Sequence, residues 1–214
     1  MLHYNTVSPL LKSILDTLME AEAFEDFRLV GGTALSLYYG HRMSVDIDLF
    51  TDAEYSSVDF EAIDTFLRET YKYVDTNDYD VIGMGKSYYV GNHEDDCIKL
   101  DLFYVDSFFN DAVVIDNIRI ATVEEIIAMK LEIVVNGGRK KDFWDIVELS
   151  GEYSFDEMLA LHEKRYPFSH DRDLLIANFT DFDEADDDFE PDCLRGRHWE
   201  LVKLDIVSFV EGEL

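Results

Sequence analysis

The first predicted helix has one apolar face. When residues 10–18 are placed at helical spacing, five side chains fall on the same side: Leu10, Leu11, Ile14, Leu15 and Leu18. Ser8 and Pro9 come directly before them, and a hydroxyl cap followed by proline in the first turn is typical of a helix start. We expect this helix to cover the core.

The following hydrophobic runs are short and change between strand and helix spacing. Residues 29–30 predict a short strand, 33–39 a helix, 45–50 a second strand and 59–73 a covering helix. Beyond them, short β-rich runs are broken by Gly, Asp and Asn, at residues 79–84, 87–90, 97–105 and 119–120. This spacing predicts a strand meander.

After residue 121 the pattern becomes helical. Thr122 to Glu125 has the sequence of a capping box, and the helix that it opens closes at Asn136, Gly137 and Gly138. Three more helices are predicted, from 140 to 150, from 154 to Pro167 and from 197 to 210. The acidic segment 181–192 is expected to be a solvated loop.

Together these elements predict an α/β (α+β) fold of two parts. A small mixed β-sheet with flanking helices would occupy residues 1–120, and a C-terminal helical lobe, residues 121–214, would complete the active site. No apolar run approaches the roughly 20 residues of a membrane span, and the N-terminus does not have the pattern of a signal peptide. We therefore expect a cytoplasmic protein with no membrane partner.

Charge restricts the partners. The chain has 47 acidic and 18 basic residues, a formal net charge of −29. Such a field repels nucleic acid, so a polynucleotide would have to bind at a local group of cations, whereas a basic protein would be attracted. The two cysteines, Cys97 and Cys193, have no Cys or His neighbours at the spacing of a zinc site.

Two aspartates on one strand are the first chemical signal. Residues i and i+2 of a strand point to one face, so Asp46 and Asp48 point together while Val45, Ile47 and Leu49 point the other way. Two carboxylates on one face repel each other, and a divalent cation with a preference for oxygen ligands, Mg²⁺ or Mn²⁺, relieves that repulsion. The alternative is a solvated strand face.

A glycine pair precedes these aspartates. Gly31 and Gly32 lie between the first predicted strand and the helix that begins at Thr33. Glycine lets backbone N–H groups approach an anion, and a helix N-terminus favours negative charge. The sequence therefore predicts a phosphate cradle beside a metal site.

This stretch resembles the signature of the DNA polymerase β-like nucleotidyltransferase superfamily. The signature is an apolar residue followed by two glycines, then a gap, then Asp-apolar-Asp-apolar. The spelling Arg42-Met43-Ser44-Val45-Asp46-Ile47-Asp48 is similar to that of the AbiEii/AbiGii toxin-type nucleotidyltransferases. The resemblance covers roughly residues 28 to 150 and implies a third carboxylate on a later strand. Asp101 has the required setting, and the alternative for it is an edge-strand acid that faces water.

The same resemblance implies later motifs that read here as Lys130, then Arg139-Lys140-Lys141, then Asp142 to Asp145. It implies catalytic roles for Asp46, Asp48, Asp101, Lys130 and Asp142, with the metal on the first three. It further implies nucleotide contacts from Gly31, Gly32, Thr33, Arg42, Ser44, Lys130, Arg139 and Lys141. Lys130 would meet the triphosphate, and Asp142 would orient a lysine or act as a base.

The expected activity is Mg²⁺-dependent transfer of a nucleoside monophosphate from an NTP to an acceptor hydroxyl. As in the resembling toxins, the acceptor would be a tRNA-type end and the partner a cognate antitoxin. The alternatives are a nucleotidyltransferase for a small molecule of the aminoglycoside kind and a non-catalytic module that binds a nucleotide or a partner. If tRNA is the acceptor, its phosphates must meet the few cations near the site, about two to four of them at once. The candidates are His41, Arg42, Lys130, Arg139, Lys140 and Lys141.

Overall fold

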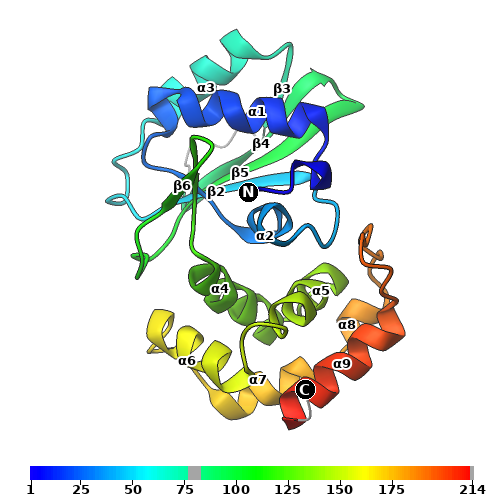
Figure 1. Ribbon diagram of the computed structural model, residues 1–214. Helices are drawn as coiled ribbons and strands as arrows, with labels where there is room; N and C mark the ends of the chain where they lie inside the picture. The colour runs from blue at the N-terminus through cyan, green and yellow to red at the C-terminus, as the bar shows by residue number, and fades with distance from the viewer. Residues whose placement is uncertain (77–82, 213–214) are drawn as a thin grey trace.

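The computed structural model describes residues 1–76 and 83–212, which form a seven-stranded mixed sheet with helices on both faces (Figure 1). The strand order is β3-β4-β5-β2-β1-β7-β6. The pairs β2·β5 and β1·β7 are parallel and the other pairs are antiparallel. The strands are β1 Arg28–Leu29, β2 Asp46–Thr51, β3 Tyr73–Thr76, β4 Gly85–His93, β5 Asp96–Tyr104, β6 Val113–Ile115 and β7 Ile118–Ile120.

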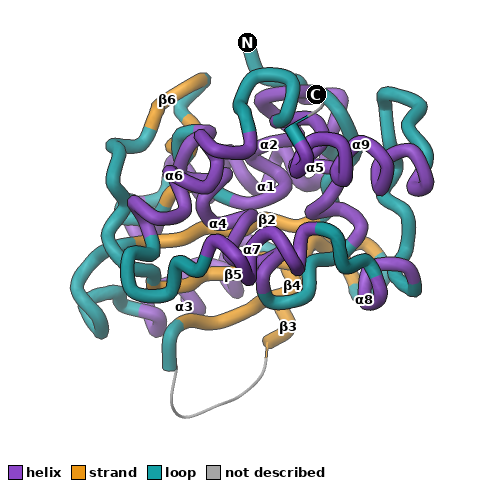
Figure 2. The backbone as a smooth tube through the Cα atoms, turned by 90° about the horizontal axis from the view of Figure 1, so that it is seen from below, coloured by secondary structure: helices purple, strands orange, loops and turns teal. Residues whose placement is uncertain are grey.

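Helices α1 (Pro9–Glu20) and α3 (Phe60–Thr70) cover one face of the sheet, and α2 (Gly31–Tyr39) lies on the other. Beyond α2 the C-terminal half is helical, and it lies in front of the strands in the view from below (Figure 2). Its helices are α4 Val123–Val135, α5 Lys140–Leu149, α6 Phe155–Arg165, α7 Arg172–Phe179, α8 Asp183–Asp186 and α9 Trp199–Glu211, and two short 3₁₀ turns, Tyr4–Thr6 and Glu22–Phe24, flank α1. No helix in the described ranges is long and apolar enough to cross a bilayer.

Strand alternation decides what the sheet offers to each side. In the register of β2 and β5, Ile47 pairs with Leu100 and Leu49 with Leu102, and all four are fully buried on the side of α1 and α3. Burying a side chain of this size contributes about 1.5–3 kcal/mol. The residues between them necessarily face the other side. The core therefore fixes the direction of the polar residues that follow.

Most helix starts follow the predicted chemistry. The Ser8 hydroxyl accepts a hydrogen bond from the Leu11 N–H at 3.0 Å, with Pro9 in the first turn of α1. Ser154 and Glu157 form the capping box of α6. Each cap satisfies N–H groups that have no partner within the helix.

The predicted capping box of α4 is only half formed. The Thr122 hydroxyl accepts from the Glu125 N–H, but the Glu125 carboxylate turns away. It accepts from the backbone N–H groups of Phe109 and Asn110 and forms an ion pair with Arg165 at 2.6 Å. Because these groups are buried with it, the carboxylate gains more there than at a helix start in water.

Three other expectations need correction or fall outside the described residues. The helix predicted to Tyr73 ends at Thr70, and Tyr73 opens β3; β6 was not predicted. The strand expected at 79–84 lies mostly outside the described residues. The acidic segment is not wholly a solvated loop. It contains α8, and its Asp186 accepts hydrogen bonds from Trp199 Nε1 at 2.5 Å and Lys203 Nζ at 3.0 Å.

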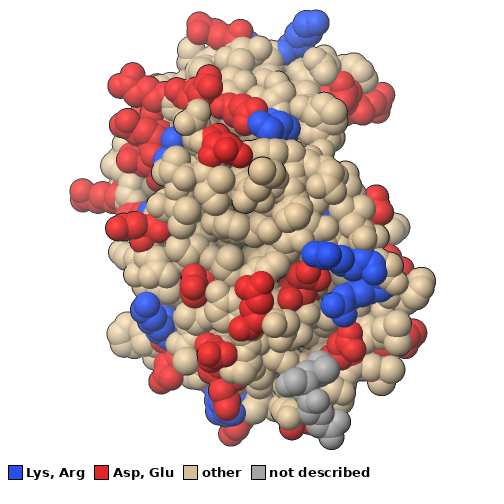
Figure 3. All heavy atoms as spheres, viewed as in Figure 1, with Lys and Arg blue, Asp and Glu red and all other residues tan. Residues whose placement is uncertain are grey.

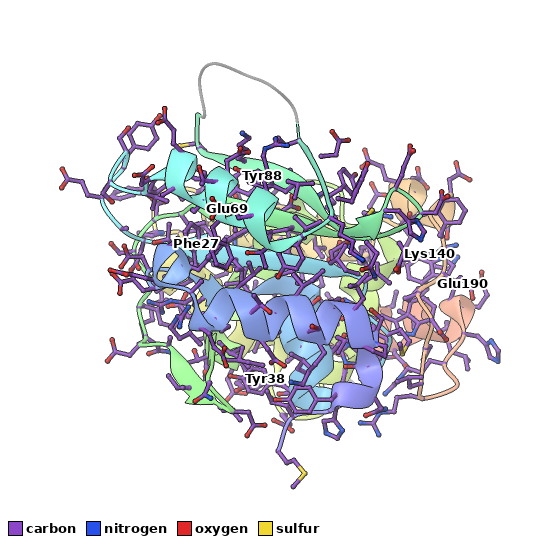
Figure 4. All side chains as sticks on the ribbon, turned by 90° about the horizontal axis from the view of Figure 1, so that it is seen from above. Phe27, Tyr38, Glu69, Tyr88, Lys140 and Glu190 are labelled. Carbon is purple, nitrogen blue, oxygen red and sulfur yellow. The ribbon has the colours of Figure 1, made fainter. Side chains whose placement is uncertain are left out.

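The segment after α8 returns to the sheet half. The Met43 N–H donates to the Asp192 carbonyl at 2.8 Å, and the Leu194 N–H donates to the His41 carbonyl at 2.9 Å. Viewed from above, Lys140 and Glu190 lie on the same side of the molecule (Figure 4). This return pairs the residues just before β2 with the C-terminal half.

Candidate active site

Two neighbouring strands place three carboxylates and one ammonium group on the face of the sheet opposite α1 and α3. In the parallel register of β2 and β5, Asp46 pairs with Lys99 and Asp48 with Asp101. Paired residues point to the same face, so the four side chains form a square. The predicted third carboxylate, Asp101, is thus the direct neighbour of Asp48.

Protein donors hold both oxygens of Asp101. Ser87 Oγ, on β4, donates to Oδ1 at 2.5 Å, and the Lys99 ammonium donates to Oδ2. Burial lowers the pKa of Lys99, but its hydrogen bond to Asp101 and the charges of Asp101, Asp46 and Asp48 raise it overall. Lys141 approaches the same face from α5, with 3.7 Å between its Nζ and Asp46 Oδ2.

Asp48 lies against the first turn of α2. A Cβ on Gly31 would come within 2.6 Å of Asp48 Oδ2, and Gly31 has φ +68°, so only glycine fits this junction. Burial, followed by the charges of Asp101 and Asp46, raises the pKa of Asp48 to about 6 despite the opposing charges of Lys130 and Lys141. The square is therefore electrostatically strained at Asp48.

A cleft of about 270 Å³ opens beside Asp48, between the sheet and the helices α4 and α5. Its lining combines apolar side chains with ammonium, guanidinium and carboxylate groups. Its lining residues are Val30, Gly31, Gly32, Asp48, Phe50, Ile126, Met129, Lys130, Ile133, Arg139, Lys141 and Asp142. Both halves of the molecule thus contribute to one cleft, and Asp101 lies beyond its edge.

Behind the cleft lies a buried charge network. Asp145 accepts from Arg42 Nε at 2.7 Å and Nη2 at 2.8 Å, from His41 Nε2 at 2.7 Å, and pairs with Lys130 at 2.7 Å. Although burial opposes it, the cations Arg42 and Lys130 hold the pKa of Asp145 well below its usual range. Lys130 also donates to Asp142 at 2.6 Å. Asp142 therefore orients a lysine, one of the two roles considered for it.

Two predicted nucleotide contacts bond to each other instead of facing the cleft. The hydroxyls of Thr33 and Ser44 lie 2.7 Å apart and are buried, and Thr33 Oγ1 also donates to the Asp46 carbonyl at 2.5 Å. In this arrangement they join the start of α2 to the start of β2. The backbone N–H groups of Gly31 and Gly32 remain at the cleft, where the first turn of a helix has no internal partners for them.

The six cations expected to meet tRNA phosphates do not form one surface patch. His41 is 1% exposed, Arg42 3%, Lys130 3% and Lys140 7%. The Lys140 ammonium lies 5.6 Å from the ring centre of Trp199. These four candidates are therefore held in the interior by carboxylates and an aromatic ring, which leaves two of the six for phosphate contact. Arg139 and Lys141 keep 58% and 36% of their side chains exposed.

The surface seen in Figure 3 carries many acidic and few basic side chains. Arg139 is paired with Asp188 of the acidic segment 181–192, with 2.9 Å between Nη2 and Oδ1. Asp188, like Asp186, is therefore ion-paired and not simply solvated. The exposed cations at the cleft lie on a surface that is acidic overall.

The donor set of the square fits a hard divalent cation. Three carboxylates supply only oxygen ligands, as Mg²⁺ and Mn²⁺ prefer, and burial together with their mutual repulsion raises the pKa of Asp48. Within residues 1–76 and 83–212, no three His, Cys, Asp or Glu side chains converge closely enough to enclose an ion. In this arrangement Lys99 and Ser87 hold Asp101, so a cation there would have to replace at least one of them.

The sequence predicts no role for Lys99 or Ser87, and it includes Asp145 only as the end of a motif. Lys99 could have been found, because it stands two residues before Asp101 on one strand and must share its face. Asp145 lies one helical turn from Asp142 and so follows the same face of α5. Ser87 belongs to another strand, and nothing in its local pattern gives its register.

Comparison with known proteins gives a family. The sequence profile described as "Nucleotidyl transferase AbiEii toxin, Type IV TA system" matches residues 13–211. The uncharacterized protein aq_aa25 of Aquifex aeolicus (strain VF5) is 29% identical over 203 residues, which is 90% of each chain.

Solved structures share the fold. JHP933 from Helicobacter pylori has a TM-score of 0.59 at 21% identity, with 95% of this chain and 88% of that chain covered. MenT4, a nucleotidyltransferase toxin from Mycobacterium tuberculosis, has a TM-score of 0.56 at 14% identity, with 92% and 79% covered. These likenesses confirm the expected fold class, and the profile match confirms the expected family.

Proposed function

The chain belongs to the AbiEii family of nucleotidyltransferase toxins, and from this premise we propose that Asp46, Asp48 and Asp101 form its catalytic centre. The proposed reaction transfers a nucleoside monophosphate from an NTP to an acceptor hydroxyl, with release of pyrophosphate. The observation that supports it is the register of Asp48 with Asp101 beside a cleft lined by Gly31, Gly32 and Lys141.

Asp46 and Asp48 would hold Mg²⁺ or Mn²⁺ against the triphosphate, and Asp101 would hold the ion beside the acceptor hydroxyl. Bound there, the ions would neutralise charge on the α-phosphate and favour loss of the hydroxyl proton. Of the three carboxylates only Asp48 lines the cleft. Asp101 is assigned to the acceptor side because it comes from the neighbouring strand β5, whereas Asp46 shares β2 with Asp48.

The cleft would hold the nucleotide in a fixed direction. The N–H groups of Gly31 and Gly32 would meet the phosphates, and Lys141 and Arg139 would compensate the charge that develops on the departing pyrophosphate. The apolar side chains of the lining, Phe50, Ile126 and Met129, would accept the base. Lys130 would act from the wall of the cleft, where Asp142 and Asp145 hold it.

The helices after residue 121 would then form the lobe that completes the site. Met129, Lys130, Arg139 and Lys141 line the same cleft as Gly31 and Asp48 although they come from the other half of the chain. A division into residues 1–120 and 121–214 accounts for this arrangement.

The proposed acceptor is a tRNA-type end, and the proposed partner is an antitoxin encoded beside the toxin gene. The decisive test incubates the protein with each labelled NTP and Mg²⁺ or Mn²⁺, and with either total tRNA or aminoglycosides. Label should pass to tRNA with the wild type but not with Asp48→Asn. Absence of transfer to either acceptor under all these conditions would contradict the proposal.

One observation favours a second acceptor class. Four of the six cations expected to hold RNA are buried, and the chain carries a net charge of −29. A cationic small molecule of the aminoglycoside kind would be attracted by this field instead of repelled. Transfer to aminoglycosides and not to tRNA in the same assay would identify this activity.

A further inference from the structure

Lys99 occupies the position in the carboxylate square where positive charge is needed. It stands opposite Asp46 in the register and two residues before Asp101, so its side chain rises between the two acids. Its ammonium donates to Asp101 Oδ2. The three carboxylates thus already have a counterion supplied by the chain.

The neighbouring ammonium group, Lys141, has a different setting. It comes from α5, lies 3.7 Å from Asp46 Oδ2 and lines the nucleotide cleft. Lys141 can therefore stay and meet phosphates when the cleft fills. Lys99 does not line that cleft. The one hydrogen bond of its ammonium group among the described residues is to Asp101.

Lys99 is also able to leave. Its side chain is 38% exposed, whereas that of Asp101 is 15% exposed. The residue that pairs with it on the outer side is Tyr89 of β4, which is 44% exposed, so the open sheet surface there can receive the long side chain. Ser87, with its short side chain on β4, can stay on Oδ1 of Asp101 while Oδ2 becomes free.

We propose that Lys99 is a resident counterion of the catalytic carboxylates, which a divalent cation must displace from Asp101 before the site becomes active. The inference rests on the proposed function, because it takes Asp101 as a ligand of that cation. Lys99 is a positioning residue in this scheme. It holds the square together without metal and lowers the affinity of the square for metal by competition.

The consequence is a pair of opposite effects in one variant. Without Lys99, the three carboxylates lose their counterion, so the metal-free protein should be less stable. The same loss removes the competitor and adds net negative charge, so a divalent cation should bind more tightly. A lysine with a merely structural role would give the first effect without the second.

The test is Mn²⁺ binding without nucleotide, measured by electron paramagnetic resonance of the free ion. Lys99→Met and Lys99→Gln should each bind Mn²⁺ roughly tenfold more tightly than the wild type, on the order expected for one charge removed near a divalent ion. Lys99→Arg keeps the charge and should not bind more tightly. Using two neutral variants protects the test against one that fails to fold.

Lys86→Met is the matched control. Lys86 lies on β4, in register with Leu102, and therefore on the opposite face, where it pairs with Asp64 at 3.7 Å. Its replacement removes the same charge from a strand next to β5, and the Mn²⁺ affinity should stay within about twofold, since no carboxylate of the square loses a partner. The midpoint temperature of thermal unfolding in EDTA should be roughly 2–4 °C lower for Lys99→Met than for the wild type, and Mn²⁺ should reverse this loss.

The possible results separate the inference from the proposed function. If the wild type and Asp48→Asn bind Mn²⁺ equally, the square is not a cation site and the proposed function fails. If binding is lost in Asp48→Asn but is unchanged or weaker in both neutral Lys99 variants, only the counterion role is overturned. Tighter binding in the neutral variants alone supports it.

Discussion

Arg42 and Asp145 form a buried two-point ion pair that joins the segment before β2 to helix α5. The Nε–Oδ1 and Nη2–Oδ2 distances are 2.7 and 2.8 Å, and neither side chain has appreciable solvent exposure. Arg42 stands four residues before Asp46, so this pair couples the strand of Asp46 and Asp48 to the helical half. The network around Asp145 therefore supports the site from behind.

Replacing Asp145 by Ala should destabilise the protein by about 3–5 kcal/mol, because Arg42 and Lys130 would stay buried without their shared partner. Urea unfolding with both NTP and metal absent measures this directly. Asp156→Ala is the control, since Asp156 also pairs with an arginine, Arg172, but both side chains are largely exposed. That variant should stay within about 0.5 kcal/mol of the wild type. Equal losses in the two variants would contradict a supporting role for the network.

The raised pKa of Asp48 predicts a pH dependence of the metal-free protein. Its folded value, about 6, exceeds its ordinary value of 3.8, so the folded state binds the proton more tightly than the unfolded state between these two values. Stability should therefore decrease as pH rises from about 4 to above 6. Because Asp48 is partly exposed, we expect the contribution to be only about 1–2 kcal/mol.

Asp48→Asn should remove this component and be more stable than the wild type at pH 7.5 but not at pH 4. Urea unfolding in EDTA at several pH values gives the comparison. Parallel stability profiles for the two proteins would show that Asp48 ionises as in the unfolded chain. Mg²⁺ should abolish the difference at pH 7.5 by stabilising only the wild type.

The sequence allowed the sheet residues of the site to be placed because strand periodicity is strict. Alternation puts Asp46 and Asp48 on one face, and the apolar residues between them point into the core. A third carboxylate on a later strand was implied by the resemblance to the nucleotidyltransferase signature, and alternation in β5 gave Asp101 the required setting. The place of the glycine pair at the start of a helix could also be predicted, and the structure adds that Gly31 approaches Asp48 too closely for a side chain.

Burial of the basic residues could not be predicted in the same way. Lys130, Lys140 and Arg42 have the local sequence of exposed helix or loop cations, and only tertiary contacts with Asp145 and Trp199 take them inside. The local sequence around these cations cannot identify Asp145 or Trp199 as partners, because each belongs to a different element of the chain from the cation that it contacts. The ion pairs of the acidic segment could not be predicted for the same reason. Asp186 pairs with Lys203 and Asp188 with Arg139, and both partners lie elsewhere in the sequence.

Asp101→Asn should lose turnover while NTP affinity stays within about tenfold, or roughly 1.4 kcal/mol. The reason is position, since Asp48 lines the cleft proposed to hold the nucleotide and Asp101 does not. Calorimetric NTP binding with Mg²⁺ and single-turnover transfer would be compared with those of Asp48→Asn. We expect Asp48→Asn to abolish both. A fully active Asp101→Asn enzyme would mean that the third carboxylate lies elsewhere.

Lys130 and Lys141 should differ in what their loss affects, although both line the cleft. Lys141→Ala should weaken NTP binding about tenfold with little change in stability, because Lys141 is one-third exposed and its carboxylate neighbour is 3.7 Å away. Lys130→Met should instead cost about 3 kcal/mol or more of stability, since it leaves Asp142 and Asp145 short of a buried partner. Urea unfolding and NTP calorimetry on both variants test this. The reverse assignment of effects would contradict the placement.

The salt dependence of acceptor binding should distinguish the two acceptor classes. If tRNA is the acceptor, its phosphates can meet few exposed cations at the cleft, chiefly Arg139 and Lys141, because Lys140 and the others are buried. Counterion release then gives a slope of log affinity against log salt of only about −1 to −2.

Lys141→Ala should reduce that slope by about one unit, whereas Lys12→Ala on α1, which removes an equal charge whose ion pair is with Asp16, should leave it unchanged. The variants are compared by tRNA binding across a salt series at saturating metal. A slope near −5 or steeper would require an RNA surface that the cations at this cleft cannot provide.

For a cationic small-molecule acceptor, salt should also weaken binding, since it screens the attraction of the acidic surface. Removing Lys141 should then leave acceptor affinity unchanged or raise it, because one repulsive charge is gone. The sign of the Lys141→Ala effect on acceptor affinity therefore decides between the two acceptors.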